Sequence, residues 1–154
     1  MNYWLLKSEP ACFGIADLKA RPRRTAHWDG VRNYQARNFL RDSIGKGDLA
    51  LFYHSSCAEP GIAGIVEVVR AGYPDHTALD PDAEHYDPKS SAVNPIWYMV
   101  DVRLQREFRA PVTLATLRNT PALATMRLLA RGSRLSVLPV LKREWDTILK
   151  LERS

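Results

Sequence analysis

The chain has 154 residues, of which 45% are hydrophobic and 25% charged, and its formal net charge is +5. This size and composition predict a single domain over residues 1–154, built around its own core. No run of 18 apolar residues occurs and the N-terminus lacks the basic and apolar regions of a signal peptide, so we expect no membrane partner.

The N-terminal thirty residues predict a strand, a helical turn and a loop. Residues 3–7 are short, aromatic and apolar, as in a strand, and residues 14–20 fit one helical turn. The arginine cluster that follows, with the Asp29-Gly30 turn signal at its end, indicates a loop over residues 21–30.

A helix is predicted over residues 31–44, and the Gly45-Lys46-Gly47 triplet ends it. Its apolar residues recur at helical spacing and share one face: Ala36, Phe39, Leu40 and Ile44. The opposite face is polar or aromatic: Tyr34, Arg37, Asn38 and Arg41.

Two strands and a long loop come after this helix. Residues 48–54 are apolar at both alternating positions, which predicts a strand buried on both faces. Residues 62–69 form the next strand, and Gly64 within it indicates a bulge or a close backbone approach. Residues 73–95 hold four prolines among many polar residues, and a loop of this length in a compact domain is usually functional.

The C-terminal third predicts two strands and two helices. Residues 96–104 are rich in β-branched and aromatic residues, as in a strand, and residues 113–119 look helical with Thr113 as N-cap. A strand at 134–140 and an amphipathic helix at 141–151 close the chain. Because no β-α-β repeat occurs, we expect an α+β fold whose curved, mostly antiparallel sheet forms a β-barrel flanked by short helices.

Charge alternates along the chain. Residues 19–46 carry eight lysines and arginines against two acids, and residues 102–154 carry eleven against four. Residues 59–101 between them carry two against eight. This polarity is typical of a surface that attracts a polyanion, although solvated helix faces can produce the same pattern.

Enzyme and metal motifs are absent from the sequence. No Gly-rich phosphate loop or nucleophile elbow occurs, the histidines have no metal-binding spacing, and we expect no metal and no other cofactor. His54 stands three residues before Cys57, but catalytic pairs meet in space rather than in sequence. Two distant cysteines, Cys12 and Cys57, indicate a reducing compartment without disulfides.

The segment 27–41 combines an aromatic ring, hydrogen-bonding groups and arginines at a loop–helix junction. Trp28 lies outside any apolar periodicity, beside Asp29 and near Asn33. A flat ring suits a nucleobase, carboxylates and amides read base edges, and arginines hold phosphates. A core position explains Trp97 better than a binding site does, and for Trp28 a core position remains an alternative. The sequence therefore favours a nucleic-acid-binding site around Trp28.

Seven motifs, in order along nearly the whole chain, resemble the EVE domain family. They are YWLLKSEP at 3–10, WDGVRNYQARNFLR at 28–41, GDLALFYHSS at 47–56, GIAGIVEVV at 61–69, YDPKSS at 86–91, WYMVDV at 97–102 and RGSRLSVLPV at 131–140. The resemblance implies a PUA-like fold and recognition of a modified base in nucleic acid, notably a modified cytosine in DNA, without chemistry of its own. Met1 directly precedes the first strand, with no basic extension, which favours a free-standing cytoplasmic protein.

The EVE family is similar in fold to YTH domains, which bind methylated adenine in RNA in an aromatic cage. Matching positions imply that Trp28 is a stacking wall and that Ser8 and Glu9 give polar contacts at the floor. Asp29 and Asn33 are candidate readers of the base edge, His54 and Ser55 could face the same cavity, and Trp97 is a further candidate wall. The candidates for phosphate contacts are Arg32, Arg37, Arg131 and Arg134.

The function expected is therefore non-enzymatic binding of DNA or RNA that carries a modified base, with defence or RNA-processing assemblies as possible larger partners. An RNA-binding module remains an alternative. A second alternative is a small-molecule site without nucleic acid, and ligand binding there would not depend on salt. A third is a nuclease or hydrolase that uses Cys57 or His54.

Overall fold

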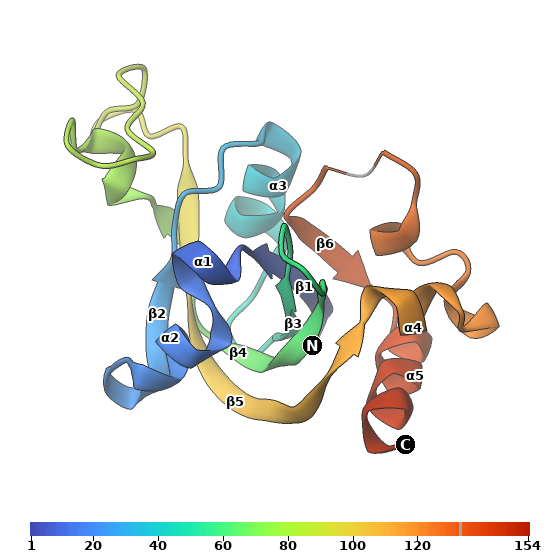
Figure 1. Ribbon diagram of the computed structural model, residues 1–154. Helices are drawn as coiled ribbons and strands as arrows, with labels where there is room; N and C mark the ends of the chain where they lie inside the picture. The colour runs from blue at the N-terminus through green and yellow to red at the C-terminus, as the bar shows by residue number, and fades with distance from the viewer. Residues whose placement is uncertain (133) are drawn as a thin grey trace.

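The computed structural model describes residues 1–132 and 134–154, and its centre is one strongly curved sheet (Figure 1). The strands lie in the order β2-β5-β4-β3-β1-β6. They are β1 (Tyr3–Ser8), β2 (Thr25–Trp28), β3 (Leu49–His54), β4 (Gly61–Pro74), β5 (Tyr98–Thr113) and β6 (Val137–Val140). Among the strand pairs of the described residues, β1 and β3 are parallel and the other four pairs are antiparallel.

This architecture confirms the expected α+β fold with a mostly antiparallel sheet. A closed barrel is not shown, because β2 and β6 end the strand order and no pairing joins them in the part of the chain described. Both edge strands are only four residues long, so each edge has few free backbone groups that could form hydrogen bonds with a further strand.

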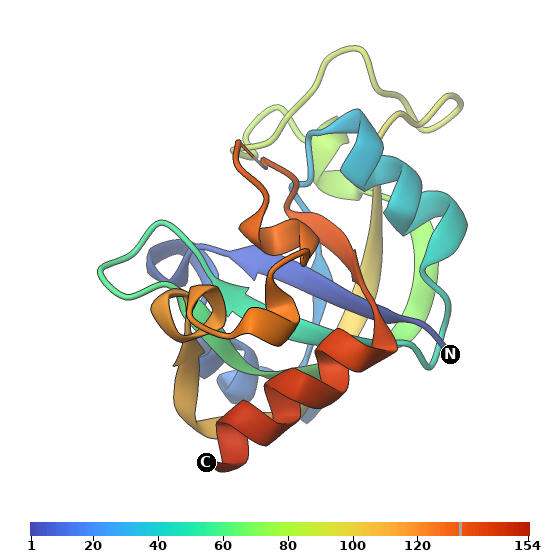
Figure 2. The ribbon, with the colours of Figure 1, turned by 90° about the vertical axis from the view of Figure 1, so that its right-hand side faces the viewer.

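Helices cover the two faces of the sheet (Figure 2). They are α1 (Pro10–Phe13), α2 (Ile15–Ala20), α3 (Tyr34–Asn38), α4 (Leu114–Arg118) and α5 (Lys142–Arg153). Thr113 caps α4, as predicted, by accepting a hydrogen bond from the amide of Thr116. No helix in the described ranges is long and apolar enough to cross a bilayer.

Helix α3 begins three residues later than predicted. Asn33 has an extended backbone and its side chain accepts a hydrogen bond from the amide of Ala36, so it is the N-cap. A π-helical turn, Phe39–Ser43, continues α3 and closes with a hydrogen bond from the amide of Ile44 to the carbonyl of Phe39. The predicted apolar face is confirmed: Ala36, Leu40 and Ile44 are buried, and Phe39 is partly buried against the same core.

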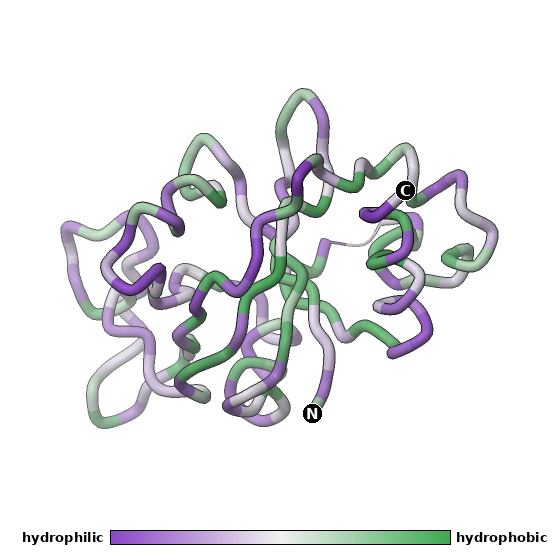
Figure 3. Tube along the Cα trace, turned by 90° about the horizontal axis from the view of Figure 1, so that it is seen from below, coloured by the Kyte–Doolittle hydropathy of each residue, from purple (hydrophilic) through white to green (hydrophobic). Residues whose placement is uncertain are grey.

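The core has two parts because the central strands are apolar on both faces. Along β1, Trp4 and Leu6 pack on one side, toward α2 and α3, while Leu5 packs on the other, toward α4 and α5. Strand β3 divides in the same way, as its sequence predicted. In Figure 3, hydrophobic stretches run through the middle of the molecule, while the peripheral segments mix hydrophilic and hydrophobic residues.

The predicted loop over residues 21–30 is wrong in its second half, which forms strand β2. Trp28 ends this strand opposite Val100 of β5, and only 6% of its surface is exposed. The local signal was the alternation of Thr25 and His27 with Ala26 and Trp28, which the neighbouring arginines and the Asp-Gly turn obscured. The strand brings the indole into the core while leaving one edge at a cavity.

Gly64 marks a bulge, as predicted, because the β4–β5 register shifts between Ile62 and Gly64. A side chain there would lie 2.5 Å from the Cδ1 atom of Ile15 and 2.6 Å from the carbonyl oxygen of Arg106. The absence of a side chain at Gly64 therefore allows Ile15 of α2 to pack directly on the sheet.

Candidate functional site

A cavity of about 680 Å³, here named the first cavity, opens where the end of β1, helix α1 and strand β2 meet the long loop before β5. This volume falls within the range of about 300–1,000 Å³ that is typical of small-ligand sites. Four of the predicted base-binding residues line it: Ser8, Glu9, Trp28 and Asp29. The first cavity is therefore the candidate base-binding site.

Aromatic rings form the inner wall of the first cavity. The Trp28 ring stands edge-on to Phe52 at 5.3 Å between centroids and edge-on to Phe13 at 6.4 Å. Phe52 is fully buried, and the Ser8 hydroxyl donates a 2.6 Å hydrogen bond to the carbonyl of Phe13. The wall is thus fixed before any ligand binds. Most of the indole surface of Trp28 is buried in the core, so only a small part of it can contact a ligand.

Carboxylates lie around the first cavity, and they affect a neighbouring thiol. Three of them line it, from Glu9, Asp29 and Glu84. Desolvation together with Glu9 and Glu84 raises the pKa of the nearby Cys12 thiol. Since the thiolate is the nucleophilic form, this shift lowers the fraction of reactive thiolate at neutral pH.

Besides Arg32, Lys7 and Arg21 are cationic residues that line the first cavity, and neither was predicted from the sequence as a site residue. Burial lowers the pKa of Lys7, and the guanidinium of Arg21 lies 5.3 Å from the centre of the Phe13 ring. The signal for Lys7 was its place at the end of a buried strand, one residue before Ser8. The cavity therefore offers hydrogen-bond acceptors and donors around an apolar floor.

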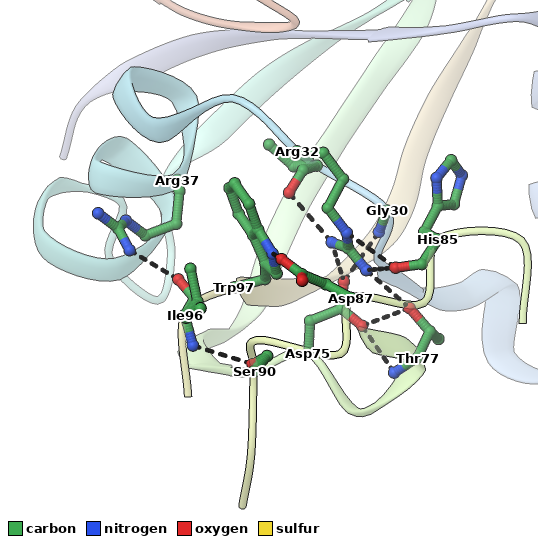
Figure 4. A network of polar contacts seen from close by, with 11 residues as sticks. Gly30, Arg32, Arg37, Asp75, Thr77, His85, Asp87, Ser90, Ile96 and Trp97 are labelled. Atoms are coloured by element: carbon green, nitrogen blue, oxygen red, sulfur yellow. Dashed lines mark hydrogen bonds and ion pairs between the residues drawn. The ribbon is translucent and has the colours of Figure 1, made fainter. Parts of the chain in front are cut away.

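A buried ion pair holds the long loop against this cavity (Figure 4). The Asp75 side chain has no solvent exposure and accepts hydrogen bonds from the amide of Gly30 at 2.9 Å and from Arg32 at 3.0 Å. Burial opposes ionisation of Asp75, but hydrogen bonds from Thr77, Gly30 and Arg32 outweigh it, so its pKa lies below the ordinary value. Asp75 is therefore a structural carboxylate.

Arg32 is occupied within the protein, which corrects its predicted role as a phosphate contact. Its guanidinium makes five hydrogen bonds, which use all five N–H groups: two to the carbonyl of His85 and one each to Asp75, Thr77 and the carbonyl of Val31. No N–H group of Arg32 is left for a phosphate oxygen. The residue fastens the loop segment that carries Glu84 and His85, which line the cavity.

Gly30 allows the loop to approach so closely. Its φ is +79°, in the left-handed region, and a Cβ atom there would lie 2.7 Å from the Cδ2 atom of the His85 ring. Only glycine combines this backbone conformation with that contact at low cost. The Asp29-Gly30 signal thus marks one wall of the site rather than an isolated surface turn.

Trp97 and Arg37, both predicted site residues, lie outside the first cavity. The Trp97 indole donates a 2.7 Å hydrogen bond to Asp87, lowering the pKa of that carboxyl, and stacks on Tyr34 at 4.9 Å between ring centroids. Arg37 donates to the carbonyl of Ile96 at 2.7 Å. These contacts fasten the other end of the long loop to α3 (Figure 4).

Three other predicted residues have local structural partners. The side chain of Asn33 caps α3. The Nε2 atom of His54 accepts a 3.1 Å hydrogen bond from the amide of Ile15, and burial lowers the pKa of His54, so this nitrogen is not available as a catalytic base for Cys57. The amide of Ser55 donates to the carbonyl of Ser8, and Ser55 lines a different cavity.

Of the remaining phosphate candidates, Arg131 lines the same cavity as Ser55, and Arg134 is exposed. Within residues 1–132 and 134–154, no group of three or more histidine, cysteine or acidic side chains could hold a metal ion. The arrangement is thus a preformed aromatic and polar cavity with basic residues beside it.

Comparison with known proteins places this architecture in a family. A family model described as the EVE domain matches residues 2–151. The chain belongs to the EVE domain family. Human thymocyte nuclear protein 1 is 45% identical over 168 residues, which cover 98% of this chain and 74% of that protein.

Several solved structures resemble the chain closely. One is the human THYN1 protein in complex with DNA containing 5-methylcytosine, 44% identical with a TM-score of 0.93, covering 100% of this chain and 99% of that one. Another is a hypothetical protein from Leishmania major, 46% identical with a TM-score of 0.94, covering 99% and 95%. A Pseudomonas putida protein is 47% identical with a TM-score of 0.91, covering 97% and 99%.

Proposed function

We propose that this EVE domain is a binding module, not an enzyme, that takes one modified base of a nucleic acid into the first cavity, with 5-methylcytosine in DNA as the first candidate. The observation that carries the proposal is the preformed cavity at Trp28, which combines aromatic walls with carboxylates. The THYN1 complex with 5-methylcytosine DNA, in a chain 44% identical, supports the choice of base.

The chemistry of cytosine matches the groups around the cavity. The exocyclic N4 amino group donates hydrogen bonds, and carboxylates such as Glu9 and Asp29 are its usual acceptors. The C5 methyl group needs an apolar contact, which Phe13 and the free edge of Trp28 offer. Burying a group of this size contributes about 0.8 kcal/mol, so the methylated base should bind about fourfold more tightly than cytosine.

Base entry requires extrusion from the stack, which costs a few kcal/mol in a paired duplex and least in a single strand. Preformed walls lower that cost on the protein side, because Trp28, Phe13 and Phe52 are already packed. Lys7 and Arg21 beside the cavity, with Arg131 and Arg134 further along the chain, are the cations proposed to hold the flanking backbone.

An oligonucleotide titration panel tests the proposal. Short DNA and RNA oligomers would carry cytosine, 5-methylcytosine, 5-hydroxymethylcytosine or N6-methyladenine, and tryptophan fluorescence would be followed at two salt concentrations. We expect preference for a methylated base and affinity that falls steeply with salt. Salt-independent binding of a free small molecule, or turnover of the nucleic acid, would refute it.

A variant locates the binding to the first cavity. Glu9→Gln keeps the side-chain shape but removes one anionic acceptor, and we expect it to lose about 1 kcal/mol, or about fivefold, in affinity for the methylcytosine oligomer. Glu59→Gln is the matched control, since Glu59 is exposed and lines neither this cavity nor the one that contains Ser55. Equal affinity of the two variants would contradict the assignment of Glu9.

A further inference from the structure

A second cavity of about 570 Å³ lies on the other side of Lys7 from the first. Lys7 lines both, and the second is formed by the end of β3, helix α4 and residues 128–132 ahead of β6. Its charged lining residues are Lys7, Arg118 and Arg131, and no carboxylate occurs among its described lining residues. The first cavity, by contrast, mixes carboxylates with cations.

The cations of the second cavity lack protein counterions. Within residues 1–132 and 134–154, the ammonium group of Lys7 and the guanidinium groups of Arg118 and Arg131 make no ion pair and no hydrogen bond. Burial lowers the pKa of Lys7, as expected for a half-buried cation that no anion compensates. Arg32, in contrast, is saturated by internal partners.

Neutral donors complete the second cavity. Tyr53, only 3% exposed, lines it together with Ser55 and Ser56. Burial raises the pKa of the Tyr53 phenol, which therefore keeps its proton at neutral pH. Three cations with hydroxyl donors and no acid form a site for a phosphate group, whose oxygens accept charge-assisted hydrogen bonds.

The two cavities are close enough to serve one strand. The amide of Ser55, which lines the second cavity, donates a 2.9 Å hydrogen bond to the carbonyl of Ser8, which lines the first. These residues stand at the ends of the parallel strands β3 and β1, and Lys7 lies at the same end. The two cavities therefore adjoin at the end of β1, where Lys7 lines both.

We propose that the second cavity binds the phosphate group of a nucleotide that flanks the base held in the first cavity, with Arg118 and Arg131 as its specific contacts and Lys7 shared between the two sites. The inference rests on the proposed function. It adds that base identity and backbone affinity are provided by separate, adjacent sites, and that a nucleoside without phosphate uses only one of them.

The test pairs two double variants. Arg118→Gln with Arg131→Gln removes two contacts of the second cavity, while Arg109→Gln with Arg153→Gln makes the same charge change at positions that line neither cavity. Each is titrated with a single-stranded oligomer containing 5-methylcytosine, with its cytosine counterpart, with 5-methylcytosine nucleoside and with inorganic pyrophosphate. Thermal unfolding confirms that both variants fold.

For the second-cavity variant we expect the slope of log K against log salt to shrink by about 1.4, at about 0.7 per lost contact to a single strand. Its affinity loss relative to wild type should be about sevenfold larger at about 50 mM than at about 200 mM salt. Nucleoside binding and the ratio of methylcytosine to cytosine affinity should stay at wild-type values.

Two results would overturn the inference. In one, oligomer affinity and salt slope of the second-cavity variant equal those of the control variant. In the other, the variant loses pyrophosphate binding only, which would make the cavity a site for free phosphates. Failure of the proposed function is a separate observation: wild-type protein would then bind methylcytosine and cytosine oligomers equally.

Discussion

Replacing Asp75 by Asn tests whether one buried carboxylate holds the long loop against the first cavity. The Asp75 oxygens accept four hydrogen bonds: from the amide of Gly30 (2.9 Å), from Arg32 (3.0 Å), and from the Thr77 amide (2.8 Å) and hydroxyl (2.6 Å). The amide of Asn keeps the shape but removes the charge and turns an N–H₂ group toward these donors.

The expected loss is large for a single substitution. Breaking a buried ion pair costs about 3–5 kcal/mol, and we take about 3 because Arg32 retains some contact with water. The Arg32 side chain is 20% exposed and that of Asp75 is 0% exposed. For a protein of this size about 3 kcal/mol corresponds to a fall in Tm of about 6–12 °C.

Thermal unfolding of Asp75→Asn, beside Asp82→Asn as control, measures this loss. Asp82 is an exposed carboxylate in the same loop, so its replacement should leave Tm nearly unchanged. Because the pKa of Asp75 is held below its ordinary value of 3.8, its contribution is present at neutral pH and is lost as the pH falls below that value. The difference between wild type and Asp75→Asn should therefore shrink toward about pH 3. Equal Tm values for the two variants at neutral pH would refute this reasoning.

Three further substitutions probe separate contacts. Gly30→Ala should lower Tm more than Gly47→Ala, because both glycines have positive φ but only a Cβ at Gly30 meets the His85 ring; equal losses would show that this contact does not matter for stability. Because the pKa of His54 is lowered in the folded protein, the unfolded state takes up a proton more readily, and the free energy of unfolding of wild type in urea should fall as the pH drops below 6.5. His54→Gln should show a smaller fall over the same pH range. Parallel curves of stability against pH for the two proteins would contradict this. Thr113→Ala should cost about 1 kcal/mol in urea unfolding as the N-cap is lost, and no change would contradict the cap.

Local pattern predicted most of the fold. Short continuous apolar runs located β1 and β3, which are buried on both faces, and period-3.6 spacing located α3 and α5, which each bury one face. Thr113 was recognised as a cap because the side chain that makes a cap is adjacent to the helix that it starts. Such signals lie within a few residues of one another.

The candidate site was only partly predictable because its contacts are distant in sequence. Asp75 and Arg32 are 43 residues apart, and nothing near either residue shows that they pair. Arg32 was therefore expected to be free for phosphate. Lys7 was overlooked because its role depends on which elements surround the end of β1, a property of the whole sheet. Trp28 was placed at the cavity, but its burial follows from β2, a strand whose pattern is masked by the arginines before it.

The most direct test of a base-reading cavity at Trp28 is an NMR measurement of contact. An oligonucleotide with a ¹³C-labelled C5 methyl group on its methylcytosine would be bound to the protein, and intermolecular NOEs from that methyl group would be assigned. We expect NOEs to the ring protons of Trp28 and Phe13. NOEs to the exposed Tyr34 ring instead, or a methyl signal unchanged from that of the free oligonucleotide, would contradict a base-reading role for the first cavity.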